Sequence, residues 1–170
     1  MDGILEMADD FRKGGITMHM TFSSWLRIGL AAAVVVLAIS AIGYPQARRA
    51  ITVGESKGLP FSDGMLVGDT LYIAGQEGTD ANNKLVAGGI GPETQAALDN
   101  IQKVVKAAGF ELKDVVAVTA YLADIHEFGD MNKVYRSVMP DPKPTRATVQ
   151  VAALVNNARI EISAIAVKGK

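Results

Sequence analysis

The chain of 170 residues contains no cysteine, and this absence removes several kinds of chemistry. Disulfide bonds, thiolate nucleophiles and cysteine-based metal sites are all excluded. The two histidines, His19 and His126, lie far apart without the spacing of metal ligands, so we expect no metal site. The net charge is -1 and no basic cluster occurs beyond Arg48-Arg49. We therefore expect no nucleic-acid partner.

The most apolar segment lies near the N-terminus, at residues 25–44. Its uninterrupted part, residues 28–43, would span about 24 Å as a helix, whereas residues 25–44 would span about 30 Å, the thickness of a bilayer core. The segment is therefore either the hydrophobic region of a signal peptide, cleaved after Gly43 or Ser40, or a membrane anchor. A buried helix of a soluble domain is disfavoured, because no other predicted helix is apolar on all sides.

Residues 1–24 form a polar extension that is unusually acidic for a signal peptide. A start at Met18 or Met20 would give a conventional positively charged region ending in Arg27. We therefore expect the extension to be untranslated or removed. Together with residues 25–44, this pattern favours export to the periplasm or attachment to the membrane over a cytoplasmic protein.

The rest of the sequence divides into a linker, residues 45–57, and a domain, residues 58–170. Within the linker, residues 50–53 are an alternative first short strand. The domain opens with two strand segments, 65–67 and 70–76, on either side of a Gly-Asp turn, which predicts a β-hairpin.

Two amphipathic helices and three further strands follow. Residues 92–108 are apolar at helical spacing and end at Gly109, a typical C-cap. Residues 115–122 are a nearly continuous apolar run, which predicts a central strand buried on both faces. Asp124 and Glu127 have the spacing of a capping box before a second helix. That helix ends at Met139.

The last two strand segments are residues 142–151 and 159–167, and residues 159–167 are apolar enough to lie inside a sheet. This order of elements predicts an α+β fold, with both helices on one face of a mixed sheet. The other face would expose Tyr121, Leu122 and alternate residues of the last strands. Because these are too apolar to face water, we expect a homo-oligomer in which the sheets pack together.

One cation, Arg146, and one anion, Glu161, stand within these apolar strands. A charge close to a buried strand is costly unless it has a partner. Either the two side chains lie at strand ends in water or pair with each other, or they belong to a pocket. In that pocket a guanidinium would hold a carboxylate and a carboxylate would handle protons.

Six motifs occur in a fixed order along the domain, and each is short. They are YIAGQ (72–76), ALDNI (97–101) with AAG (107–109), VTAYLAD (118–124), MNKVY (131–135), PTRATVQV (144–151) and IEISAIA (160–166). In order and spacing, these motifs resemble the Rid family (YjgF/YER057c/UK114), including the RidA-like enamine/imine deaminases. The likeness covers residues 58–167.

The resemblance implies a chorismate-mutase-like α+β fold and a homotrimer with ligand clefts between subunits. It implies a 2-iminobutanoate/2-iminopropanoate deaminase-like hydrolase. Such enzymes convert reactive enamine and imine intermediates, 2-aminoacrylate among them, to 2-keto acids and ammonia. They need neither a cofactor nor a metal. Some members have instead been described as endoribonucleases, and some have lost the deaminase residues.

Carried over residue by residue, Arg146 matches the arginine that holds the substrate carboxylate, a role suited to its planar fork of donors. Glu161 matches the acid near the attacking water. Asn132 matches a pocket asparagine, although a packing or capping role on its helix is an alternative. The backbone of Gly75 and the hydroxyl of Thr148 are further candidates for the cleft.

Two positions depart from the family pattern. Phe61 stands in place of a loop tyrosine, and Ala74 stands in place of a serine or threonine. We still expect both in the substrate pocket, with Phe61 as an apolar wall. Sites that depend on hydroxyl hydrogen bonds lose rate without them. Carboxylate binding is therefore better supported than deamination of the archetypal substrate.

Three functions remain in competition. The intact pair of Arg146 and Glu161 favours hydrolytic deamination. The missing hydroxyls and the N-terminal segment favour a non-catalytic trimer that binds small carboxylates or a protein partner. An endoribonuclease is the least favoured, because the charge is near neutral and no pair of histidines is available for acid–base cleavage.

Overall fold

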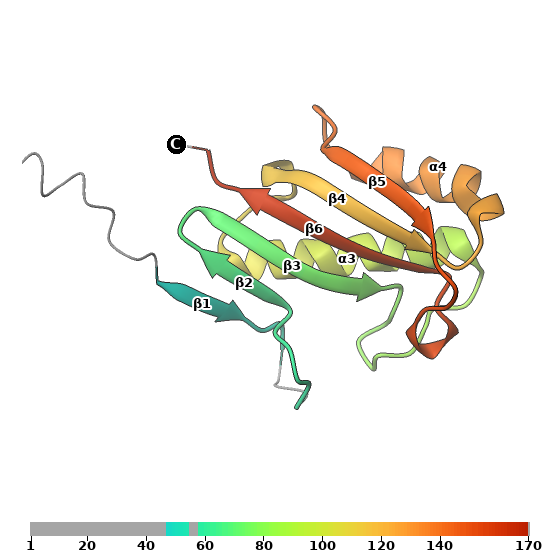
Figure 1. Cartoon of the computed structure of the whole chain (residues 1–170), viewed down its shortest axis with the longest axis horizontal. Helices are drawn as coiled ribbons and strands as arrows, with labels where there is room; N and C mark the ends of the chain where they lie inside the picture. Colours follow the sequence, from blue (N-terminus) through green and yellow to red (C-terminus); the bar gives the residue numbers. More distant parts are fainter. Residues whose placement is uncertain (1–46, 55–57, 170) are drawn as a thin grey trace, which may run out of the picture. The chain divides into compact units, whose positions relative to one another are not determined.

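The computed structural model describes residues 47–54 and 58–169. They form a six-stranded sheet with the order β1-β2-β3-β6-β4-β5 and two α-helices (Figure 1). The strands are β1 (Arg48–Ile51), β2 (Gly64–Val67), β3 (Thr70–Glu77), β4 (Val115–Leu122), β5 (Thr145–Gln150) and β6 (Ile160–Val167). The helices are α3 (Ile90–Ala108) and α4 (Phe128–Val138), with short 3-10 helices η1 (Leu112–Asp114), η2 (Ile125–Glu127) and η3 (Val155–Asn157).

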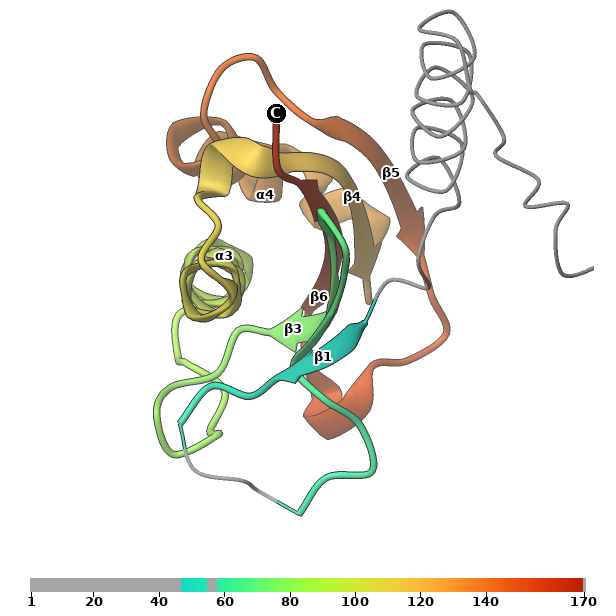
Figure 2. The ribbon, with the colours of Figure 1, turned by 90° about the vertical axis from the view of Figure 1, so that its left-hand side faces the viewer.

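The sheet is mixed, because β4 and β5 run parallel whereas all other neighbouring strands are antiparallel. Figure 2 shows α3 and α4 on the same face of the curved sheet. The predicted α+β class and the placement of both helices on one face are therefore confirmed. The predicted hairpin is also present, with β2 and β3 paired on either side of Gly68 and Asp69.

Strand β1 lies inside the range 45–57, where a linker was the first expectation and a short strand the alternative. It pairs with β2, and Ile51 is buried in the core, so the sheet begins at Arg48. The expected signal peptide or anchor at residues 25–44 and the polar extension before it lie outside the described residues. Within the described part of the chain, no helix has the length and apolarity needed to cross a membrane.

The core fills the space between α3, α4 and the sheet. Leu98 and Ile101 of α3 pack there with Leu122, Ile160 and Ile162 of the central strands, and all five are at most 1% exposed. Burying one such side chain contributes about 1.5–3 kcal/mol. Helix α3 ends at Gly109, whose φ of 84° is the left-handed conformation expected of a C-cap glycine.

The face of the sheet away from the helices carries apolar side chains that the described residues leave uncovered. Tyr72 is 50% exposed and Val149 is 45% exposed. Strand β4 was expected to be buried on both faces, but its burial alternates along the strand. Leu122 was expected on the uncovered face and is instead fully buried beneath the helices. The strand period of two explains this correction, because Leu122 shares a face with buried Val118.

Of the predicted capping box, the N-cap Asp124 is confirmed, whereas Glu127 has a different partner among the described residues. Asp124 accepts a hydrogen bond from the backbone N–H of His126 at the start of η2. Glu127 instead contacts the guanidinium of Arg159, whose backbone N–H donates to the buried carboxylate of Glu93 at 2.8 Å. An ion pair with a distant arginine thus takes the place of a local backbone contact, and it ties the start of α4 to α3 and β6.

Candidate active site

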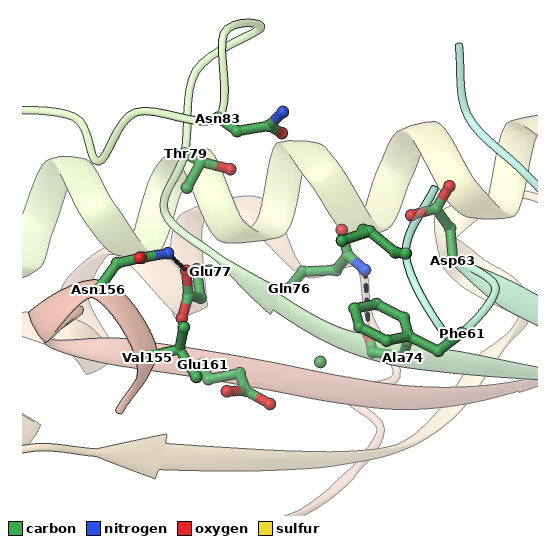
Figure 3. Close-up of a pocket in the computed structure, with 12 residues that line it drawn as sticks. Phe61, Asp63, Ala74, Gln76, Glu77, Thr79, Asn83, Val155, Asn156 and Glu161 are labelled. Atoms are coloured by element: carbon green, nitrogen blue, oxygen red, sulfur yellow. Dashed lines mark hydrogen bonds between the residues drawn. The ribbon is translucent and has the colours of Figure 1, made fainter. Parts of the chain in front are cut away.

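A cavity of about 690 Å³ opens where the last part of β3 lies beside the first part of β6. The loop before β2, the loop after β3 and η3 complete its walls (Figure 3). Its lining residues are Leu59, Phe61, Asp63, Ala74, Gly75, Gln76, Glu77, Thr79, Asn83, Val155, Asn156 and Glu161. The cavity therefore gathers four predicted site residues, Phe61, Ala74, Gly75 and Glu161.

The backbone of β3 makes room for the carboxylate of Glu161. The register between β3 and β6 shifts between Ile73 and Gln76, which places Ala74 and Gly75 in a bulge. A Cβ atom on Gly75 would lie only 1.8 Å from Oε1 of Glu161. Glycine at position 75 thus leaves the carboxylate in place, because Glu161 occupies the space that a side chain there would need.

Glu77 is a second carboxylate in the same cavity. It lies directly across the strand pair from Glu161, and its Oε2 accepts a hydrogen bond from Nδ2 of Asn156 at 3.3 Å (Figure 3). Desolvation raises the pKa of Glu77, the bond from Asn156 opposes this shift, and the charges of Glu161 and Glu93 raise the pKa further. The native fold therefore disfavours the ionised form of Glu77.

We expect the Glu77→Gln variant to be more stable than the parent protein at neutral pH. When the folded pKa of a carboxyl exceeds its unfolded value, the native state binds more protons, so stability falls as pH rises through this range. The gain in Glu77→Gln should be present above the folded pKa and vanish below the unfolded value of 4.5. Urea unfolding between pH 4 and pH 8 measures this, and a gain that is constant with pH would contradict it.

Arg146 lies on the other face of the sheet and points toward α4. Its guanidinium donates to Oδ1 of Asn132 at 2.6 Å, and its central carbon lies 4.3 Å from the ring centre of Tyr135 and 5.6 Å from that of Phe128. None of the carboxylates in the described ranges forms an ion pair with it. A neutral amide and two ring faces thus hold the cation in place and leave its charge available for an anion.

A second, smaller cavity of about 340 Å³ opens beside Arg146. Asn132, Tyr135, Arg136, Lys143 and Pro144 line it together with Arg146. Burial raises the pKa of the Tyr135 phenol, and the nearby Arg146 opposes the shift. Of the predicted site residues, this cavity therefore gathers Arg146 and Asn132.

A single protomer does not bring Arg146 and Glu161 together. Arg146 pairs in register with Val118, which is buried beneath the helices, whereas Glu161 pairs with Tyr121 on the uncovered face. The idea that the two charges simply pair with each other is therefore wrong. A shared site also cannot form within one chain, because side chains of opposite orientation point to opposite faces of a strand.

One predicted site residue lies outside both cavities, and two residues that line them were not predicted. Thr148 lines neither cavity, and its buried Oγ1 has no hydrogen-bond partner among the described residues. Sequence analysis missed Glu77, although it directly follows the YIAGQ motif on the same strand. It also missed Tyr135, which lies one helical turn after Asn132 and therefore on the same side of α4. Within the described ranges, no group of acidic and histidine side chains is placed to hold a metal ion.

Comparison with known proteins identifies the family. Residues 56–168 match the sequence model of the family described as endoribonuclease L-PSP, and this range is well over half of the chain. The chain belongs to the YjgF/Rid family. The resemblance of the six motifs is thereby confirmed, and the two cavities can be treated as features of a Rid domain.

Several relatives of this Rid domain are named. The 2-iminobutanoate/2-iminopropanoate deaminase of Homo sapiens is 42% identical over 125 residues, which are 72% of this chain and 91% of the human protein. The structure of RidA from an Antarctic Psychrobacter is 32% identical, with a TM-score of 0.66 and coverage of 71% of this chain and 99% of that chain. Escherichia coli TdcF with bound serine is 27% identical, with the same TM-score and coverage.

Proposed function

We propose that this protein hydrolyses reactive enamine and imine intermediates to 2-keto acids and ammonia. The main support is that a Rid fold here presents one cationic and one anionic side chain, each lining a cavity. A guanidinium without a carboxylate partner among the described residues lines one cavity, and a carboxylate with room made for it lines another. The human relative at 42% identity is named for this type of reaction.

The proposed site is shared between protomers of a homotrimer. Arg146 and Glu161 face opposite sides of one chain, so a ligand that contacts both must lie between two chains. The uncovered sheet face, with its exposed Tyr72 and Val149, offers the apolar surface for such packing. In a ring of identical subunits, every interface repeats the same contact, so each would supply Arg146 from one protomer and Glu161 from its neighbour.

The reaction follows from these two groups. The guanidinium of Arg146 binds the substrate carboxylate through two parallel hydrogen bonds and fixes the imine carbon in place. Glu161 of the neighbouring protomer accepts a proton from water while the water oxygen bonds to that carbon. Glu161 returns that proton to the nitrogen, which gives a tetrahedral intermediate with one OH and one NH2 group. The hydroxyl proton then also passes to the nitrogen through Glu161, so that the C–N bond breaks, the C=O bond forms and ammonia leaves.

Phe61 and Ala74 give the cavity a less polar wall than the family pattern implies. Phe61 is 59% exposed and offers a ring face, and Ala74 offers only a methyl group. This favours a second candidate function, in which the same trimer binds small carboxylates without turnover. The two functions share the guanidinium contact and differ only in the release of keto acid.

Complementation between two inactive variants tests the shared site. Arg146→Ala and Glu161→Gln are each expected to be inactive alone. After unfolding and refolding as an equal mixture, each site receives an intact Arg146 with probability one half and an intact Glu161 with probability one half. About one quarter of the parent activity should therefore return. Keto-acid release from imines generated by a dehydratase or oxidase measures this.

The outcomes separate the candidates. Activity that stays absent in the refolded mixture, while the refolded parent protein is active, rules out a site shared between protomers. If the parent protein accelerates no imine but still binds a keto acid, the non-catalytic function takes over. An endoribonuclease would require RNA cleavage that survives both Arg146→Ala and repurification.

A further inference from the structure

The cavity around Glu161 extends beyond the group proposed to activate water, and its two parts differ in chemistry. One part is apolar, with Leu59 and Phe61 of the loop before β2 at 49% and 59% exposure. The other part holds Glu77 with its hydrogen-bond partner Asn156, and Val155, which is 69% exposed, lies beside them (Figure 3). Because Glu77 is opposite Glu161 on the neighbouring strand, a ligand that extends past Glu161 toward η3 would meet Val155 and the carboxylate of Glu77.

Within one protomer, the described residues that line this cavity carry charge of one sign. Asp63, Glu77 and Glu161 line it, and none of its described lining residues is lysine or arginine. Oδ2 of Asp63 already accepts a hydrogen bond from the backbone N–H of Val53 at 2.8 Å, which anchors the loop before β2. Glu161 is engaged by the proposed chemistry. Glu77 is thus the carboxylate left to interact with the distal part of a ligand.

We propose that Glu77 makes this cavity select imino acids by the charge at the end of their side chains. Substrates with a cationic end would be accepted best, neutral ones less well, and anionic ones worst. The inference rests on the proposed imine hydrolysis and specifies the substrate class of the same site. It follows from the geometry of the wall, because an apolar stem suits Val155 while a cationic end suits Glu77.

Size and electrostatics both support a side chain longer than a methyl group. A volume of about 690 Å³ in one protomer lies in the range that proteins use for ligands much larger than 2-iminopropanoate. An anionic end would meet the repulsion of Glu77 and Glu161 together, since the two residues are opposite each other on neighbouring strands. A cationic end would relieve that repulsion and partly replace the lost hydration of Glu77.

The test compares three imines that an L-amino acid oxidase generates from arginine, methionine and glutamate. The protein competes with semicarbazide for each imine, and the loss of semicarbazone reports kcat/KM. The parent protein should prefer the arginine-derived over the glutamate-derived imine. Glu77→Gln keeps the size of the side chain and an acceptor for Asn156, and it should lower this ratio about tenfold.

The control variant removes one negative charge at a position outside the cavity. Asp99→Asn neutralises an exposed carboxylate on α3 and should leave the arginine-to-glutamate ratio unchanged. A ratio that is the same in the parent protein and Glu77→Gln overturns the selection by Glu77. An equal shift in Asp99→Asn also overturns it, because net charge would then explain the preference. Failure of the parent protein to accelerate any of the three imines contradicts the proposed hydrolysis instead.

Discussion

Replacing Arg146 with alanine is expected to lower kcat/KM for imine hydrolysis by about 10²–10³-fold. The guanidinium is held by Asn132 and by the ring of Tyr135, so it needs little reorganisation when a carboxylate arrives. Alanine removes the positive charge and both hydrogen bonds that the guanidinium is proposed to donate to the substrate carboxylate. That carboxylate is then left without a partner. The fold should survive, because the side chain of Arg146 forms no ion pair with the described residues.

Two further variants sharpen this prediction. Arg146→Lys keeps the positive charge but loses the planar fork, so it should fall between the parent protein and Arg146→Ala. Lys113→Ala removes a cation that is 64% exposed and forms an ion pair with Glu111, outside both cavities, so its activity should match that of the parent protein. Circular dichroism and light scattering confirm that each variant folds and assembles. Activity of Arg146→Ala within about twofold of the parent protein would refute the assigned role.

The elements of the fold were predictable because their signals are local. The Gly-Asp turn defined the hairpin of β2 and β3, and the apolar spacing before Gly109 defined α3. The start of α3 was placed two residues late, at Pro92 in place of Ile90, since proline is favoured in the first turn but does not fix the first residue. Glu127 was misassigned for the opposite reason, because its partner Arg159 is 32 residues away.

The arrangement of the site was less accessible to sequence reasoning. The alternation of β6 already indicates that Glu161 faces away from buried Ile160 and Ile162. Strand β5 has no comparable apolar face, so its sequence does not say which way Arg146 points. Pairing with β4 and contact with α4 decide this, and both depend on residues distant in sequence. The family motifs identified the two residues without fixing their faces.

Replacing Gly75 with alanine is expected to abolish most of the activity while leaving the fold intact. The added Cβ would lie 1.8 Å from Oε1, 2.6 Å from Cδ and 2.9 Å from Cγ of Glu161. All three atoms belong to a flexible side chain, so the carboxylate should move and the backbone should not. A displaced carboxylate no longer positions water, and we expect kcat/KM to fall about 10²-fold. The free energy of unfolding should change by less than about 1 kcal/mol.

Gly129→Ala is the matched control, because a Cβ at Gly129 of α4 meets no atom within 4 Å. That variant should keep full activity and gain about 0.5–1 kcal/mol of stability from the higher helix propensity of alanine. A double-mutant cycle that combines Gly75→Ala with Glu161→Asp tests whether the loss of activity comes from the clash between these two positions. Glu161→Asp draws the carboxylate back from residue 75, so it should cost less activity in the Gly75→Ala background than in the parent protein. Strictly additive losses in that cycle would mean that Gly75 acts on the reaction by some route other than Glu161.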